Sequence, residues 1–145
     1  MTSVERKIAW VLLFVGILEL LALPAVFIPF SWMAAIHGKL GLGEMPDEPI
    51  VAYLARSLSA YYAAHGALTV FISFDVKRYL PLIRLWALVF VAIGVVFLVI
   101  DFTSGLPLWW IVSEGTFEIV FGIIILFLLR VHSRADRHQM AGRSN

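Results

Sequence analysis

The stretch LPLIRLWALVFVAIGVVFLVID, residues 80–101, decides the fold. It is apolar throughout except for Arg84 near its start and Asp101 at its end. A helix needs about 20 apolar residues to cross the hydrocarbon core of a bilayer, so this stretch is long enough to span one. Its residues do not alternate between apolar and polar, as the strands of a membrane barrel do. The stretch therefore predicts a transmembrane helix.

Three more stretches of the same kind lie on either side, at residues 8–30, 49–74 and 107–130. Hydrophobic residues make up 61% of the 145 residues and charged residues only 14%. A soluble domain is about 45–50% apolar and roughly 25% charged, so this chain cannot cover its surface with polar groups. The sequence predicts an all-α fold, a four-helix transmembrane bundle, with residues 1–131 as a single membrane domain.

The positions of the basic residues predict how the bundle is oriented. They gather before the first span, between the second and third spans, and after the fourth: Arg6, Lys7, Lys77, Arg78, Arg134, Arg137 and Arg143. The connection 31–48 has one lysine against three acids, and the connection after residue 101 has no basic residue. The positive-inside rule then places both termini in the cytoplasm.

Two segments outside the spans have their own predictions. Ser31 is expected to cap a short helix over residues 32–40 that lies along the outer membrane interface. Residues 132–145 are expected to form a disordered, basic cytoplasmic tail against anionic headgroups, with His132 and His138 solvated. No convincing internal repeat is visible in the sequence, although it is compatible with an arrangement of two helical hairpins.

Composition and motifs exclude several classes of function. The formal net charge of +1 argues against a nucleic-acid partner, and the chain has no cysteine for thiolate metal sites or iron–sulfur clusters. Phosphate-binding glycine loops, zinc-protease and nucleophile-elbow motifs are also missing from the sequence. We therefore expect no metal and no cofactor. The expected partners are membrane lipids, together with a protein partner or a second copy of the chain.

Four ionisable residues fall at membrane depth. Glu19 and Glu118 lie near the middle of the first and fourth spans, whereas Arg56 and Glu114 lie about 8 and 7 Å outward of the centres of their spans. A charge at the bilayer centre costs at least about 2.5–3.5 kcal/mol, so such residues should face the bundle interior and have partners.

Two pairings follow from depth and charge, and each has two readings. Arg56 with Glu114 is either a buried salt bridge that fixes helix register or a site for an anionic or zwitterionic headgroup or metabolite. Glu19 with Glu118 is either a structural pair that shares one proton or part of a proton or cation relay. His65 is either a hydrogen-bonded interior residue or a relay group, and Tyr61 lies one turn away on the same face.

Several motifs carry a resemblance to a known group. They are PFSWMAAIH at 29–37, LGLGE at 40–44, YLARS at 53–57, DVKRYLP at 75–81, and GLPLWW at 105–110 followed by Glu114-Gly115. Over nearly the whole chain they resemble a group of bacterial four-span membrane proteins of unknown activity. The architecture is similar to that of DoxX-like membrane proteins. The resemblance implies four helical spans in a bacterial inner membrane and transfers no catalytic residue.

Three functions remain open at this point. The leading hypothesis is a non-enzymatic accessory or small-ligand- or lipid-binding subunit whose interior site is Glu19, Arg56, Glu114 and Glu118. The alternative is a small proton-coupled transporter or carrier in which the acids titrate during transport. A membrane enzyme that acts on a lipid-like substrate, with one acid as general acid or base, is the third.

Overall fold

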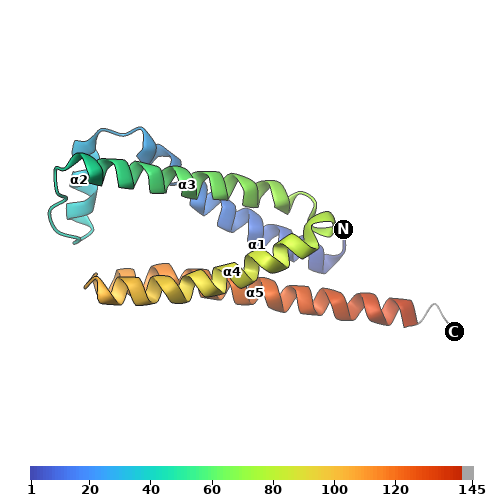
Figure 1. Ribbon diagram of the computed structural model, residues 1–145. Coiled ribbons are helices and arrows are strands. Elements are labelled where there is room, and N and C mark those ends of the chain that lie inside the picture. Colours follow the sequence, from blue (N-terminus) through green and yellow to red (C-terminus); the bar gives the residue numbers. More distant parts are fainter. Residues whose placement is uncertain (142–145) are drawn as a thin grey trace. The chain divides into compact units, whose positions relative to one another are not determined.

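The computed structural model describes residues 1–141, with side chains up to residue 135, and every regular element in that range is a helix (Figure 1). The elements are α1 (Ser3–Leu20), the 3-10 helix η1 (Leu23–Val26), α2 (Phe30–Lys39), α3 (Pro49–Ser73), α4 (Val76–Thr103) and α5 (Leu108–Ala141). The predicted all-α class is confirmed.

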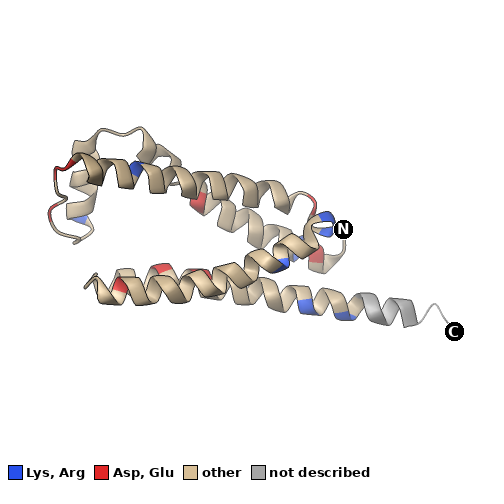
Figure 2. Ribbon diagram, viewed as in Figure 1, with Lys and Arg blue, Asp and Glu red and all other residues tan. Residues whose placement is uncertain are grey.

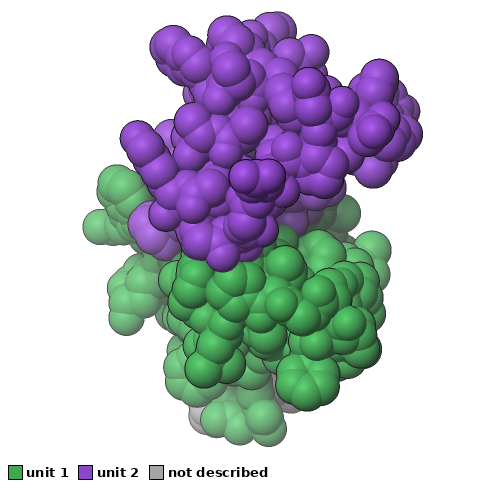
Figure 3. All heavy atoms as spheres, turned by 90° about the vertical axis from the view of Figure 1, so that its left-hand side faces the viewer, with its two compact units in different colours: residues 1–13, 71–145 green, residues 14–70 purple. Residues whose placement is uncertain are grey.

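The chain folds into two compact units (Figure 3). Unit 1 comprises residues 1–13 and 71–145, so it contains the start of α1, the end of α3, and the helices α4 and α5. Unit 2 comprises residues 14–70, with the rest of α1, η1, α2 and most of α3.

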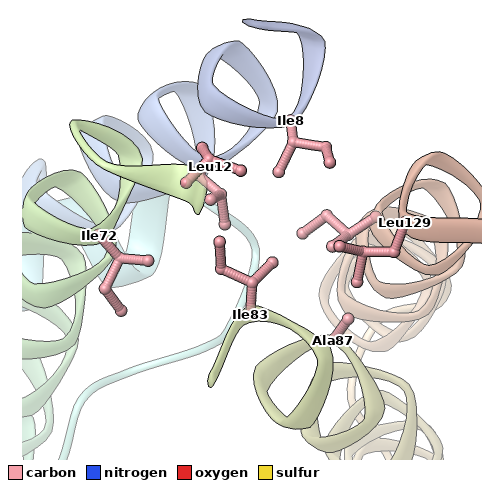
Figure 4. Packing of buried hydrophobic residues seen from close by; sticks show 8 residues of the cluster. Ile8, Leu12, Ile72, Ile83, Ala87 and Leu129 are labelled. Atoms are coloured by element: carbon pink, nitrogen blue, oxygen red, sulfur yellow. The ribbon is translucent and has the colours of Figure 1, made fainter. Parts of the chain in front are cut away.

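In unit 1, α4 and α5 form an antiparallel hairpin. The turn at residues 104–107 contains Gly105 at φ +68°, a left-handed conformation that glycine adopts without strain. The start of α1 and the end of α3 add to an apolar core at one end of this hairpin (Figure 4). Its buried members are Ile8, Leu12, Ile72, Val76, Ile83, Ala87, Ile125 and Leu129. This core holds the basic end of the unit together.

The two ends of α4 are fixed by polar side chains. The Asp75 carboxylate accepts a hydrogen bond from the backbone N–H of Arg78 at 3.2 Å, which satisfies a free donor of the first turn. At the other end, the Thr103 hydroxyl donates to the carbonyls of Val99 and Ile100. Asp75 therefore lies at a helix boundary, as its position in the sequence predicts.

In unit 2, the first predicted span is not one continuous helix. The prediction is a span over residues 8–30, whereas α1 begins at Ser3 and ends at Leu20, and η1 follows. Pro24 lies in the first turn of η1, where its missing N–H costs no helical hydrogen bond. The predicted short helix at 32–40 is present as α2, but Pro29 rather than Ser31 occupies its N-cap position.

Three helical segments are long and apolar enough to cross a membrane, which indicates a membrane protein: Ser3–Val26, Val76–Thr103 and Leu108–Ala135. Helix α3 has the length for a span, but Arg56, His65 and several tyrosines and serines lower its hydropathy. Large apolar side chains on the candidate spans are exposed, as lipid-facing residues would be, including Trp10, Phe14, Phe102, Leu108 and Phe127.

The C-terminal segment differs from its prediction. Helix α5 continues past Arg130 to Ala141, so the disorder predicted from residue 132 does not begin there. His132 is 6% exposed and thus buried, which corrects the prediction of a solvated side chain. The side chain of His138 and residues 142–145 lie outside the described part of the chain.

Candidate functional site

A hydrogen bond joins Glu19 of α1 to His65 of α3 inside unit 2. Glu19 Oε2 lies 2.7 Å from His65 Nδ1. The Glu19 side chain is 9% exposed and the His65 side chain 39% exposed. One proton lies between the two groups, whether the imidazole N–H donates to a carboxylate or a carboxylic acid donates to the ring nitrogen. Two predicted site residues are therefore partners, although the sequence analysis did not pair them.

Two glycines bring these helices into backbone contact. A Cβ atom added to Gly16 would lie 2.8 Å from the Gly66 carbonyl oxygen, and one added to Gly66 would lie 2.6 Å from the Gly16 carbonyl oxygen. Each glycine thus faces the other across the crossing of α1 and α3. Small residues allow such close approach between membrane helices. The close approach explains why Glu19, one turn along α1, reaches the residue next to Gly66.

The other predicted residues of unit 2 are more exposed. Arg56 is exposed and donates from Nη2 to the carbonyl of Ile28 at 3.3 Å, just before α2. This carbonyl supplies part of the acceptor capacity that a guanidinium requires. Tyr61 is 74% exposed, so its ring lies on the surface of α3 and not beside His65 in the crossing.

In unit 1, the predicted acids Glu114 and Glu118 both lie on α5. The Trp110 indole N–H donates to Glu114 Oε2 at 2.6 Å, one helical turn away. Glu118 faces α4, because its Cβ lies 3.0 Å from the position that a Cβ on Gly94 would take. The carboxyl of Glu118 is partly buried in the contact between the two helices.

The contact between α4 and α5 repeats the glycine crossing of unit 2. A Cβ on Gly94 would lie 2.6 Å from the Gly115 carbonyl oxygen, and one on Gly115 would lie 2.5 Å from the Gly94 carbonyl oxygen. A second close approach follows along α5, where a Cβ on Gly122 would lie 2.7 Å from the Ala87 carbonyl oxygen.

Both crossings share the pattern Gly-x-x-Glu and a similar local geometry. In unit 2 the acid follows its glycine as Gly16-Ile-Leu-Glu19, and in unit 1 as Gly115-Thr-Phe-Glu118. The glutamate Cβ lies 2.9 Å from the Cβ position of the partner glycine in the first case and 3.0 Å in the second. Each unit therefore has one glutamate at a glycine crossing. This internal structural repeat is not apparent from the sequence alone.

A sequence signal for this repeat exists, but it is not specific. The pattern Gly-x-x-Glu also occurs at residues 41–44, which lie outside the helices. The two copies in helices differ from the copy at residues 41–44 because each of them faces a partner glycine on the neighbouring helix. The pairings Arg56 with Glu114 and Glu19 with Glu118 each join one residue of unit 2 to one of unit 1, and they stay predictions.

A second polar cluster in unit 1 lies near the N-terminus and was not predicted. Glu5 is 5% exposed, and its Oε1 lies 3.9 Å from Nε2 of the buried His132. The same carboxylate accepts from the Thr2 backbone N–H at 2.7 Å, while the Thr2 hydroxyl accepts from the Glu5 N–H at 3.2 Å. This reciprocal pair is a capping box, and its pattern, threonine followed three residues later by glutamate, is readable in the sequence.

Asp101 is also buried, at 4% exposure, near the end of α4. Its position at the end of an apolar stretch predicts a boundary residue, and its burial is not apparent from the sequence. Within residues 1–135, no group of three or more histidine, aspartate or glutamate side chains is placed to hold a metal ion.

Comparison with known proteins gives no further identification. No protein-family model, curated protein or solved structure matches the chain.

Proposed function

We propose that the chain crosses the bacterial inner membrane four times, with both termini in the cytoplasm. The three apolar helical segments support this topology. Support for α3 as the fourth span comes from unit 2, where α3 packs against α1 at the glycine crossing and through the Glu19–His65 hydrogen bond. At 25 residues, α3 is long enough to cross the bilayer beside α1. The alternation of basic residues between connections gives the orientation.

Within that membrane, we propose a non-enzymatic subunit that binds a small lipid-like ligand through its intramembrane acids. The observation that carries this proposal is the 2.7 Å bond between a nearly buried Glu19 and a partly exposed His65. Ionisable groups at such depth are costly, and in membrane proteins they mark ligand or ion sites. An amphiphilic ligand would suit this site, because the polar pair lies among apolar side chains of α1 and α3.

A second candidate, a proton-coupled carrier, is favoured by the same bond for a different reason. The proton between a carboxyl and an imidazole can pass from one to the other without displacement of the helices, because an atom of each group can carry it. The internal repeat adds support, since many carriers are built from repeated helical elements that place their sites near mid-membrane.

One pair of measurements on Glu19→Gln tests both candidates. For the binding subunit, we expect the wild-type protein to retain a co-purified amphiphile that mass spectrometry detects, and the variant to lose it. For the carrier, we expect an imposed pH gradient to dissipate in wild-type proteoliposomes and to persist with the variant. The control is Glu44→Gln, a similar loss of charge in the connection between α2 and α3. Equal behaviour of wild type and Glu19→Gln in both assays would contradict both proposals.

A further inference from the structure

A pocket of about 350 Å³ lies between α4 and α5 in unit 1, apart from the glycine crossings. Helix α4 contributes Leu80, Pro81 and Arg84, and helix α5 contributes Leu129, His132 and Ser133. Three of these side chains are apolar and three are polar. The pocket therefore offers both apolar and polar side chains, one of them cationic, to a single ligand.

Two of the polar side chains that line the pocket, those of His132 and Ser133, contact neighbouring groups of the protein. His132 is buried, with Nε2 at 3.9 Å from Glu5 Oε1, and the Glu5 carboxylate is itself held by the capping box of α1. The Ser133 hydroxyl donates to the Leu129 carbonyl at 3.0 Å, which holds this side chain against its own helix. Arg84 is exposed and brings a permanent positive charge to the opening.

The charges around the pocket are mostly positive. Lys77 precedes Arg84 by seven residues, two helical turns, so the two cations share the α4 face that carries Leu80 and Pro81. Arg130 and Arg134 follow on α5 and are exposed. Figure 2 colours basic positions on α4 and α5 toward the end of the hairpin that lies away from the turn at residues 104–107. The acids nearby have partners already: Glu5 accepts from Thr2 and Asp75 accepts from Arg78.

We propose that this pocket binds the headgroup phosphate of an anionic phospholipid. The phosphate would pair with the Arg84 guanidinium, a planar donor that suits phosphate oxygens, and the acyl chain would lie on Leu80, Pro81 and Leu129. Basic pockets between membrane helices at the cytoplasmic side bind anionic lipid headgroups in other proteins. The assignment to the cytoplasmic leaflet rests on the proposed topology, whereas binding itself rests only on the pocket.

Native mass spectrometry of the full chain in neutral detergent tests the site, with phosphatidylglycerol as the probe and phosphatidylcholine as the zwitterionic reference. We expect wild type to bind phosphatidylglycerol in preference, and Arg84→Gln to bind it about tenfold more weakly, because the charge-assisted hydrogen bonds are lost. The matched control is Arg130→Gln, which removes an exposed cation that does not line the pocket and should change binding by about twofold or less. Arg84→Lys should keep part of the affinity.

Three results would overturn the proposal. The first is equal loss of binding in Arg84→Gln and Arg130→Gln, which means attraction by general surface charge. The second is displacement of the lipid by millimolar glycerol 3-phosphate, which assigns the pocket to a soluble phosphate. The third is loss of thermal stability in Arg84→Gln with retained lipid, which makes Arg84 structural. None of these results depends on Glu19→Gln, so the lipid site and the proposed function can fail separately.

Discussion

Replacing Gly66 by alanine is expected to destabilise unit 2 by about 1–3 kcal/mol, the usual cost of an overpacked contact. The added Cβ would lie 2.6 Å from the Gly16 carbonyl oxygen and 2.9 Å from both Glu19 Cβ and Leu20 N. Backbone atoms cannot rotate away, so the two helices must separate. Separation would also lengthen the Glu19–His65 hydrogen bond. Thermal unfolding in detergent, followed by circular dichroism, measures the loss.

Gly38→Ala provides the matched control, since Gly38 is also a helical glycine, in α2. A Cβ there would meet only the Gly43 carbonyl oxygen, at 3.9 Å, an ordinary contact. Because alanine has a higher helix propensity than glycine, Gly38→Ala should leave the free energy of unfolding unchanged or raise it by up to about 1 kcal/mol. Gly94→Ala, at the equivalent crossing in unit 1, should resemble Gly66→Ala. If Gly66→Ala were as stable as Gly38→Ala, the close crossing of α1 and α3 would be wrong.

A double-mutant cycle on Glu19 and His65 should give the second large effect. We expect Glu19→Leu and His65→Leu each to destabilise the protein, because each leaves the remaining polar group without its partner at membrane depth. The double variant should lose less than the sum of the single losses. The difference should lie within about 0.6–1.7 kcal/mol, the range from average to largest coupling between polar side chains of membrane helices.

The Glu19→Gln variant distinguishes the effect of the hydrogen bond on stability from the effect of the carboxyl on proton transfer. A glutamine amide can still bond to the imidazole, so stability should remain close to that of wild type while any proton transfer through residue 19 is lost. In the double-mutant cycle, losses of stability in Glu19→Leu and His65→Leu that simply add in the double variant would show that the two side chains do not interact. A large loss of stability in Glu19→Gln alone would show that the carboxyl, and not merely a hydrogen bond, holds the crossing together.

The helical class and most helix positions can be predicted from the sequence, because long apolar stretches in a bilayer have few structural choices. The match is best for residues 80–101 and 49–74, which lie within or close to α4 and α3. It fails where local backbone chemistry competes with apolarity. Residues 21–29 are as apolar as a span, yet Pro24 and Pro29 interrupt the helix there.

The residues of the candidate site can be predicted from the sequence, but the partner of each residue cannot. Depth placed Glu19 and His65 inside the membrane, whereas their hydrogen bond depends on which faces of α1 and α3 meet. Gly16 and Gly66 determine which faces meet, because they allow the two backbones to approach closely. This role can be recognised only from the positions of both helices. The burial of His132 was missed for a similar reason, since a polar, basic tail sequence gives no sign that the helix continues through it.

The most direct test of the account is whether α3 crosses the membrane. The chain has no cysteine, so single cysteines introduced at Ser3, Glu44, Lys77 and Ser104 can be labelled without background. With a membrane-impermeant maleimide on intact cells, we expect Glu44→Cys and Ser104→Cys to react. Ser3→Cys and Lys77→Cys should react only after the membrane is opened. Labelling of Glu44→Cys and Lys77→Cys from the same side would contradict four spans and, with them, an intramembrane Glu19–His65 site.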